Sequence, residues 1–326
     1  MTRVRDVAAA PSPSAQSSFA DDVRVGLTAR GQKTLPPKHL YDALGSALFE
    51  AITQLPEYGL WRAERALLRE NAEEIAGRMR ATSVIELGSG SATKTIYLLE
   101  AMLRRRAVTY CTVDLSSAAL EMTRRELDGL QGLTVRSVED EYLPGLESAM
   151  GSLATHGRTL VLFLGSSLGN FEPLASLRFL QRIRRLLRPG DGLLLGADLE
   201  KPVNQLLAAY DDALGVTAAF NLNLLVRMNR ELGADFVLSQ FRHRARFNAD
   251  MRNVEMHLES LRDQAVHFSK AGFSVPFRAG ETVHTESSHK YSLDELGCLA
   301  GNSGFLCTAN WVDPGLRFFS GLFIAE

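Results

Sequence analysis

The stretch Val84-Ile85-Glu86-Leu87-Gly88-Ser89-Gly90-Ser91 joins an apolar run to a helical pattern, and it decides the fold. Glycine at such a turn lets the backbone approach a ligand closely, and the helix that follows presents free N–H groups at its start. A dinucleotide-binding loop would carry a third glycine at position 93, where this chain has Thr93. Glu86, just before the loop, suits a cationic ligand better than a pyrophosphate. Taken alone, the loop predicts either a ligand-binding turn or only a tight connection.

Strand and helix patterns alternate on both sides of this loop. Apolar runs predict strands at 83–87, 108–114, 133–138, 159–164 and 192–197, and helical periodicity fills 94–105, 117–127 and 173–187. This order is typical of a parallel sheet with helices on both faces. Two further strand patterns, near 308–312 and 318–325, end the chain. We therefore expect an α/β fold in which a Rossmann-like sheet is completed by an antiparallel C-terminal hairpin.

Polar residues follow three of the predicted strands, at the edge where open α/β sheets bind their ligands. Asp114 ends the second strand, where a carboxylate can accept both ribose hydroxyls of a nucleoside; the alternative, a helix N-cap, is already filled by Ser116. Asp140 follows the third strand and either reads an adenine amino group or is a solvated loop carboxylate. Asn170 follows the fourth and either binds a substrate carboxylate or amine or caps its loop. The glycine loop and the acid at the strand end together predict a nucleoside cofactor.

The regular alternation stops after the fifth strand. Beyond it and before the first strand, helical patterns cover 36–79 and 201–230, and strand patterns cover 236–248 and 254–260. We predict that 21–80 and 199–286 form an inserted α+β substrate-binding domain, and that 81–198 and 287–326 form the sheet domain. Residues 1–20, rich in Ala, Ser and Pro, predict a disordered tail.

Composition excludes several classes of partner. Of 326 residues, 45% are hydrophobic and 23% charged, and a net charge of −2 gives no basic face for nucleic acid. No apolar stretch is long enough to span a bilayer, so we expect no membrane partner. Three cysteines (Cys111, Cys298 and Cys307) lack metal-ligand spacing and favour a reducing cytoplasm, and the histidines form no convincing metal set. Because no exposed apolar stripe stands out, we expect a monomer.

The chain carries a series of short motifs in a fixed order. They are Leu35-Pro36-Pro37-Lys38, Tyr41-Asp42-Ala43-Leu44-Gly45-Ser46, Leu55-Pro56-Glu57-Tyr58, Glu86 to Gly90, Gly165 to Phe171, Tyr210-Asp211-Asp212, Gly215 to Asn221, Glu255-Met256-His257-Leu258 and Thr285 to Tyr291. Together, over nearly the whole chain beyond about residue 20, they resemble the histidine-specific N,N,N-trimethyltransferases of ergothioneine biosynthesis. The resemblance implies a class I fold that binds S-adenosyl-L-methionine (SAM). It also implies transfer of methyl groups to the α-amino nitrogen of L-histidine, three times, to give histidine betaine (hercynine).

The resemblance also implies which residues form the site. It implies cofactor contacts from Tyr58, Gly88, Lys94, Asp114 and Asp140, and substrate contacts from Tyr41, Asn170, Tyr210, Met256, Glu286 and Ser288. Tyr41 and Asn170 are the implied catalytic residues. Tyr41 would orient the amine and help remove its proton, directly or through water, while Asn170 and Tyr210 would hold the carboxylate.

The chemistry of one pair agrees with a histidine substrate. Neutral imidazole offers one donor and one acceptor nitrogen. Glu286 and Ser288 are two residues apart on a strand and so share a face, where they can address both nitrogens. Without the resemblance, the pair would equally predict a polar strand edge facing solvent, and Tyr41 and Tyr58 would be half-buried packing residues.

Several positions depart from the family pattern. Glu141 replaces a Phe, Gly59 and Leu60 follow Tyr58 where a Tyr and a Pro are usual, and Ser287 and His289 replace apolar or small residues. Two alternatives therefore stay open, a methyltransferase for another aromatic amino acid or histidine derivative and a nonenzymatic cofactor-binding or scaffold protein. A NAD-dependent oxidoreductase is excluded by the missing third glycine and the antiparallel ending.

Overall fold

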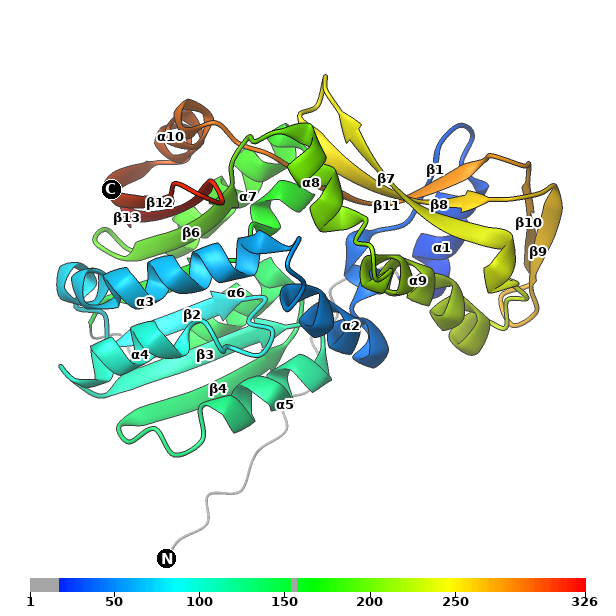
Figure 1. Cartoon of the computed structure of the whole chain (residues 1–326). Coiled ribbons are helices and arrows are strands. Elements are labelled where there is room, and N and C mark those ends of the chain that lie inside the picture. The colour runs from blue at the N-terminus through cyan, green and yellow to red at the C-terminus, as the bar shows by residue number, and fades with distance from the viewer. Residues whose placement is uncertain (1–17, 154–156) are drawn as a thin grey trace, which may run out of the picture.

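The computed structural model describes residues 18–153 and 157–326 (Figure 1). Most of the tail expected at 1–20 lies outside the described residues, but helix α1 (Phe19–Thr28) begins within it. The Ser18 side chain accepts a hydrogen bond from the backbone N–H of Asp21 at 3.2 Å, and the Asp21 carboxylate accepts one from the N–H of Ser18 at 3.3 Å. This capping box satisfies free donors at the first turn. The helix therefore includes the last two residues, 19 and 20, of the expected tail.

One large sheet holds seven strands in the order β12-β13-β6-β5-β2-β3-β4. Its parallel strands are β2 (Ser83–Leu87), β3 (Val108–Asp114), β4 (Leu133–Glu139), β5 (Thr159–Phe163) and β6 (Gly192–Asp198). Strand β13 (Phe318–Ala325) runs antiparallel to β6, and β12 (Phe305–Asp313) runs antiparallel to β13. The predicted Rossmann-like class I sheet with its antiparallel C-terminal hairpin is confirmed.

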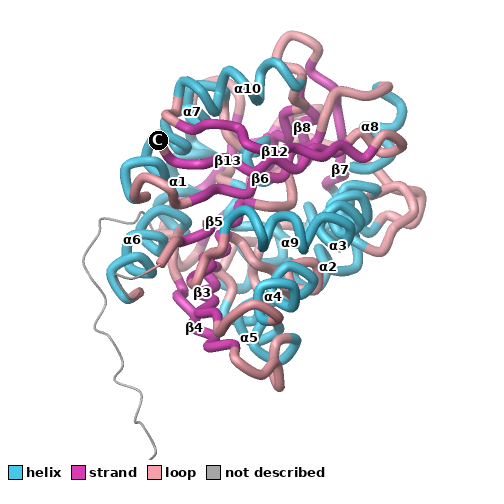
Figure 2. The backbone as a smooth tube through the Cα atoms, turned by 90° about the vertical axis from the view of Figure 1, so that its left-hand side faces the viewer, coloured by secondary structure: helices cyan, strands magenta, loops and turns pink. Residues whose placement is uncertain are grey.

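Helices cover both faces of the large sheet (Figure 2). One face carries α3 (Gly59–Met79), α4 (Ile96–Leu103) and α5 (Ser117–Glu126); the other carries α6 (Tyr142–Ser152), α7 (Pro173–Leu186) and α10 (Leu293–Asn302). Val84 packs in the core on the α3 and α4 side, and the next residue, Ile85, packs in the core on the α6 and α7 side. Because both faces are covered, all of β2 is buried, and buried parallel strands read as continuous apolar runs.

Helix α6 had not been predicted from the sequence. It contains Pro144 and Gly145, two residues that disfavour helices and weaken any helical pattern. Proline is tolerated in the first turn, where its missing N–H has no intrahelical acceptor. The helix gains its stability from packing, because Leu146 and Ala149 are buried in the core of the sheet.

A second lobe lies beside the large sheet and has a core of its own (Figure 1). Its sheet has the order β1-β11-β8-β7, formed by β1 (Lys33–Thr34), β11 (Thr282–His289), β8 (Asn253–Ser260) and β7 (Phe241–Asn248). Its other elements are α1, η1 (Pro37–Leu40), α2 (Ala43–Thr53), α8 (Val203–Tyr210), α9 (Val216–Leu232), η3 (Leu238–Gln240) and a hairpin of β9 (Gln264–Phe268) and β10 (Phe273–Phe277). The helical stretch expected at 201–230 is two helices, and the hairpin and β1 had not been predicted.

The two lobes meet where β11 leaves the second sheet and reaches the end of β6. The N–H of Tyr291 donates to the carbonyl of Asp198 at 3.0 Å, and the N–H of Glu200 donates to the carbonyl of Tyr291 at 3.1 Å. These bonds fix the end of β11 against the carboxyl edge of the large sheet. That edge is where ligands of open α/β sheets bind.

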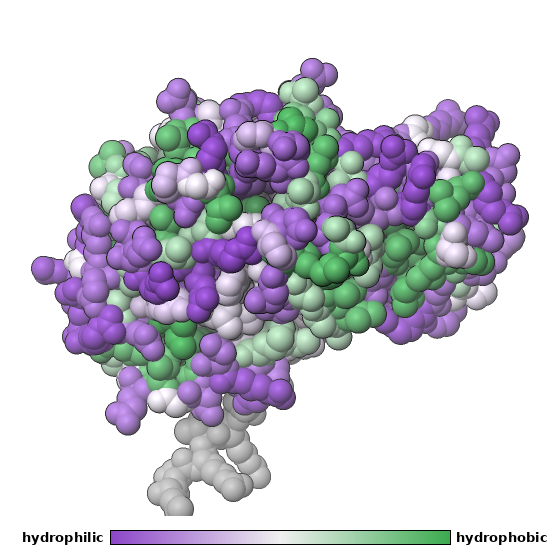
Figure 3. All heavy atoms as spheres, viewed as in Figure 1, coloured by the Kyte–Doolittle hydropathy of each residue, from purple (hydrophilic) through white to green (hydrophobic). Residues whose placement is uncertain are grey.

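The surface in Figure 3 is mostly hydrophilic over α3 and α4, and apolar side chains gather toward α2 and α9. Exposed large apolar residues include Leu44 in α2 and Leu214 just before α9. Within the part of the chain that the structure describes, no helix combines the length and apolar character that crossing a bilayer requires.

Candidate active site

The glycine loop forms a tight turn at the carboxyl end of β2. Gly88 and Gly90 have φ angles of +74° and +54°, in the left-handed region that glycine adopts without steric cost. The N–H of Gly88 donates to the carbonyl of Val113 at 2.8 Å, which ties the loop to the neighbouring strand. A Cβ on Gly88 would lie 3.2 Å from the Tyr142 hydroxyl, so a larger residue there would crowd the loop.

Asp114 lies at the end of β3, beside this loop. Its carboxylate accepts hydrogen bonds from the N–H of Ser116 at 2.9 Å and the N–H of Gly90 at 3.4 Å. The Ser116 hydroxyl accepts from the N–H of Ala119 and caps α5, as expected. Burial raises the pKa of Asp114, and the backbone bonds oppose that rise. The N–H of Asp140 donates to the carbonyl of Asp114 at 3.3 Å, so the two predicted acids lie side by side.

Glu86 does not face a ligand, and this corrects our expectation. Its carboxylate accepts from the hydroxyls of Thr95 at 2.8 Å and Tyr110 at 2.5 Å, and the residue is 1% exposed. Burial raises its pKa to about 7, and the two hydroxyl bonds oppose the rise. The loop sequence alone could not reveal that both partners lie on the same sheet face as Glu86.

Lys94 is engaged with a buried acid from α3. Its ammonium forms an ion pair with Glu64, which is fully buried and also accepts from the N–H of Gly165 at 2.9 Å. The pair joins α3 to the segments after β2 and β5. Sequence analysis missed Glu64, since it lies 30 residues from Lys94 within an amphipathic helix.

Replacing Lys94 with Met should lower the free energy of unfolding by about 3 kcal/mol, because Glu64 would keep a buried charge without its cation. Thermal melting measures this loss, and Arg65→Met, on the exposed side of α3, is the control. We expect the SAM dissociation constant to change less than about threefold, since the ammonium is already occupied. Unchanged stability with a tenfold weaker SAM affinity would instead make Lys94 a cofactor ligand.

An aromatic cluster lines the boundary between the lobes. The ring centroid of Tyr41 lies 5.5 Å from that of Phe49 and 5.4 Å from that of Phe220. The ring centroid of Tyr58 lies 6.2 Å from that of Phe49 and 6.3 Å from that of Tyr210. Burial raises the pKa of Tyr41 and Tyr58 well above the ordinary value, and the nearby Glu286 adds to the rise. Both phenols therefore stay protonated at neutral pH.

Glu286 projects into this region from β11. It pairs across the sheet with Met256 of β8, so the two side chains lie on one face of the second sheet. Glu286 is 7% exposed, and none of the described residues offers a hydrogen bond to its buried Oε2 atom. Burial raises its pKa to about 7, and the charge of Lys290 opposes the rise. A buried carboxylate oxygen without a donor is costly, which points to a ligand that supplies one.

Ser288 lies two residues further along β11 and is also buried. Its oxygen accepts from the Tyr210 hydroxyl at 2.7 Å and from the Lys290 ammonium at 2.9 Å. The pair Glu286 and Ser288 is therefore not a solvent-facing strand edge. Sequence analysis had placed Tyr210 and Ser288 in the site separately and missed Lys290, which joins them.

Asn170 ends the short helix η2 (Ser167–Asn170), which packs against β11. A Cβ on Gly169 would lie 2.9 Å from the carbonyl oxygen of His289, so the two backbones touch. Among the residues that the structure describes, none forms a hydrogen bond with the Asn170 side-chain amide. The amide is half-buried at the carboxyl edge of β5 and is available to a ligand.

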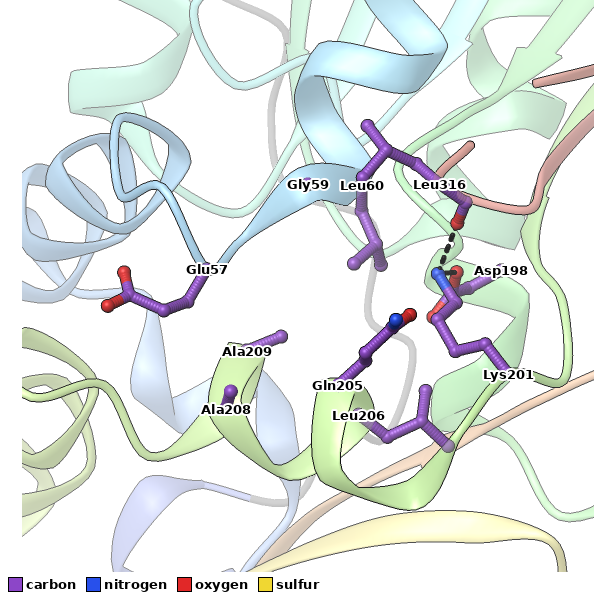
Figure 4. Close-up of a pocket in the computed structure, with 10 residues that line it drawn as sticks. All are labelled: Glu57, Gly59, Leu60, Asp198, Lys201, Gln205, Leu206, Ala208, Ala209 and Leu316. Carbon is purple, nitrogen blue, oxygen red and sulfur yellow. Dashed lines mark hydrogen bonds and ion pairs between the residues drawn. The ribbon is translucent and has the colours of Figure 1, made fainter. Parts of the chain in front are cut away.

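A cavity of ≈ 190 Å³ opens behind Tyr58, between the start of α3 and α8 (Figure 4). It is lined by Glu57, Gly59, Leu60, Asp198, Lys201, Gln205, Leu206, Ala208, Ala209 and Leu316. In Figure 4 Lys201 reaches both Asp198 and the carbonyl of Leu316, at 2.6 Å each. None of the predicted site residues lines this cavity.

The residues at the sheet edge fit a cationic nucleoside cofactor. Asp114 and Asp140 offer carboxylates beside a glycine turn, which suits ribose and adenine. Tyr58 supplies an aromatic surface nearby, which suits a sulfonium group. Comparison with known proteins agrees with this chemistry. A family model described as histidine-specific methyltransferase, SAM-dependent, matches residues 19–324.

The chain belongs to this family. A histidine N-alpha-methyltransferase from Mycolicibacterium smegmatis is 41% identical over 310 residues, covering 94% of each chain. A protein of the same name from Mycobacterium tuberculosis is 39% identical over 302 residues, covering 91% of this chain and 92% of its own length. Ergothioneine biosynthesis protein 1 from Neurospora crassa is 30% identical over 289 residues, 86% of this chain and 32% of the fungal protein. The protein is thus a SAM-dependent methyltransferase of the histidine-specific family.

Proposed function

We propose that the protein transfers methyl groups from SAM to the α-amino nitrogen of L-histidine, three times, to give histidine betaine. The observation that carries the substrate assignment is the unsatisfied, buried carboxylate of Glu286 with Ser288 beside it on one strand face. A carboxylate accepts from the N–H of neutral imidazole, and a hydroxyl can donate to its second nitrogen. Met256, on the same sheet face, would pack against the ring.

The other contacts divide between the two lobes. The cofactor would be held by Gly88, Asp114, Asp140 and Tyr58. Lys94 stays a candidate cofactor contact, and the Lys94→Met variant described above tests it. Asn170 would bind the substrate carboxylate and fix which nitrogen reacts. Tyr210 was expected beside it, but its one hydroxyl hydrogen is donated to Ser288, so Tyr210 would act on the substrate through Ser288.

We predicted 21–80 and 199–286 as the substrate-binding domain and 81–198 with 287–326 as the cofactor domain. In this arrangement α3 (Gly59–Met79), which packs on the large sheet, belongs with the cofactor domain, and all of β11 (Thr282–His289) belongs with the substrate-binding domain. We also propose a cytoplasmic protein, based on its few cysteines, and a monomer, based on the lack of an exposed apolar stripe in the sequence.

Methyl transfer to an amine is an in-line displacement at the methyl carbon. SAM, when bound, supplies an electrophilic methyl group on a sulfonium. The residues of this chain then have two tasks, to align the nitrogen and to keep it neutral. Tyr41 is held as a protonated phenol by burial, so it would orient the amine through its oxygen and pass the amine proton toward water rather than act as a phenolate base.

Replacing Tyr41 with Phe should lower kcat by about 30-fold, because the amine loses the group that orients it while the ring packing on Phe49 and Phe220 is kept. SAM affinity, measured by calorimetry, should stay within about twofold. Phe49→Leu, which alters the same cluster without touching a hydroxyl, is the control for packing. A Tyr41→Phe enzyme as fast as the wild type would remove Tyr41 from the mechanism.

The proposal as a whole is tested by incubating the purified protein with SAM and an equimolar mixture of the common amino acids, and following product masses. We expect histidine alone to gain mass, ending at three methyl groups. Methylation of another amino acid with histidine unchanged would show that the departures after Tyr58, Gly59 and Leu60, have redirected the pocket, since Ser287 bonds His284 on the opposite sheet face. No product at all, with SAM still bound, would favour a cofactor-binding protein without this activity.

A further inference from the structure

Lys290 is a lysine without exposed surface at the junction of the two lobes. It follows β11 directly, its N–H donates to the carbonyl of Arg252 at 2.9 Å, and it is 0% exposed. A buried ammonium is costly unless every donor is satisfied and its charge is balanced. The contacts of Lys290 balance its charge with an ion pair and give its ammonium two hydrogen-bond acceptors.

The ammonium reaches three oxygen atoms, each at 2.9 Å. They are Oδ2 of Asp198, which balances the charge, and the hydroxyl oxygens of Tyr210 and Ser288. The ammonium donates hydrogen bonds to the two hydroxyl oxygens, and its contact with Asp198 is an ion pair.

This arrangement fixes what Ser288 can offer a ligand. Ser288 Oγ accepts from Lys290 and from the Tyr210 hydroxyl, and a hydroxyl has two acceptor lone pairs and one hydrogen. Both lone pairs are therefore filled. The only hydrogen bond that Ser288 can still form is one in which it donates.

We infer that Lys290 is a positioning residue that makes Ser288 an obligate donor and so selects a substrate with a hydrogen-bond acceptor at that point. This inference rests on the proposed function. With Glu286 as acceptor on the same strand face, the pocket then recognises one donor and one acceptor, the pattern of a neutral imidazole in a single tautomer. Lys290 acts through Ser288 and Tyr210.

The surroundings hold this network in place from both lobes. Asp198 ends β6 and also pairs with Lys201 at 2.6 Å, on the side facing the cavity of Figure 4. The carbonyl oxygen of Tyr210 accepts a hydrogen bond from Nε2 of His243 at 2.8 Å, and Nδ1 of His243 lies 3.0 Å from Nδ2 of Asn221. Tyr210 is therefore fixed at its backbone as well as at its hydroxyl, and the two hydroxyls cannot turn freely to suit another ligand.

The test compares Lys290→Met with Lys201→Met. Both variants remove a cation from Asp198, but only Lys290 touches the hydroxyls, so Lys201→Met should keep wild-type kinetics. For Lys290→Met we expect the KM for histidine to rise about 30-fold with kcat within about threefold, since uniform substrate binding is lost. If Lys290→Met alone fails to fold, the double variant Asp198→Asn, Lys290→Met takes its place in the same measurements, because it removes both charges of the ion pair.

A second readout separates positioning from general damage. The analogue 3-(2-thienyl)-L-alanine has a ring of similar size but no ring nitrogen, so Ser288 and Glu286 cannot recognise it by hydrogen bonds. Its inhibition constant should differ less than about threefold between the wild type and Lys290→Met, because the analogue never accepted the hydrogen bond from Ser288 that the variant weakens. Equal weakening of histidine and the analogue, or no weakening of either, would overturn the inference. A wild type that does not methylate histidine would instead overturn the proposed function.

Discussion

Replacing Glu286 with Ala should reduce kcat/KM for histidine by about 100-fold, because a hydrogen bond from the imidazole N–H to a carboxylate contributes about 2 to 3 kcal/mol. Glu286 is the buried acid whose Oε2 atom has no donor among the described residues, so its partner is expected to be the substrate. SAM affinity should be unchanged within about twofold, since the proposed cofactor contacts lie elsewhere. Steady-state kinetics and calorimetry measure the two effects.

Ser287→Ala is the matched control for Glu286. Ser287 is the next residue on β11, but its hydroxyl pairs with the His284 ring at 3.0 Å on the opposite sheet face. We expect this variant to keep wild-type kinetics. If Glu286→Ala were as active as Ser287→Ala, Glu286 would not bind the substrate and the histidine assignment would lose its main support.

Glu286 also predicts a pH signature in the unliganded protein. Its pKa is about 7 in the folded state against 4.5 for the ordinary value, so the folded protein holds this proton more tightly. The stability that the proton contributes is present below about pH 4.5 and is lost as the pH rises through 7. Glu286→Gln removes this loss. At pH 8 its free energy of unfolding should exceed that of the wild type by at most about 3 kcal/mol, and its melting temperature should be correspondingly higher. Near pH 5 the two proteins should melt at the same temperature.

Replacing Asp114 with Ala should weaken SAM binding by about 50-fold, because the ribose loses an ionised acceptor and the loop loses its tie to Gly90. Asp114→Asn keeps one oxygen for the N–H of Ser116, so its SAM affinity should lie between those of the wild type and Asp114→Ala. Calorimetric titration with SAM measures both variants, and Asp128→Ala, in the exposed turn after α5, is the control.

Histidine KM offers a further check on the Asp114 variants. At saturating SAM it should change less than threefold, because the substrate contacts come from other residues. An Asp114→Ala protein that binds SAM as tightly as the wild type would move the cofactor away from the end of β3.

The sequence predicted the centre of the large sheet closely because β2, β3, β5 and β6 are buried on both faces. β2 and β3 were predicted with their observed bounds, and β4, β5 and β6 each to within one residue, since apolar runs between turn residues mark such strands well. The second lobe was harder. Its β9–β10 hairpin is short, and β1 has two residues that pair with β11 some 250 positions away, which no local pattern can indicate.

The site shows the same limit at the level of single side chains. Asp114 and Asn170 follow from strand ends, and Glu286 and Ser288 follow from the family resemblance, with which alternation along a strand agrees. All four lie at the carboxyl edge of the sheet or on the adjoining β11. The interaction partners of these side chains could not be predicted from the sequence. Lys94 pairs with Glu64, Glu86 bonds Tyr110, and Lys290 joins Tyr210 to Ser288, each through contacts between residues distant in the chain.

The central claim is that the methyl groups arrive on the α-nitrogen of histidine while the imidazole is held by Glu286 and Ser288. The most direct measurement is nuclear magnetic resonance of the product formed from histidine and SAM carrying a carbon-13-labelled methyl group. The account predicts a single labelled methyl signal, from three equivalent groups, that correlates with the α-hydrogen of histidine and leaves both ring hydrogens unshifted by a new N-methyl. Labelled methyl groups that correlate with the imidazole ring hydrogens, or no label on histidine at all, would contradict it.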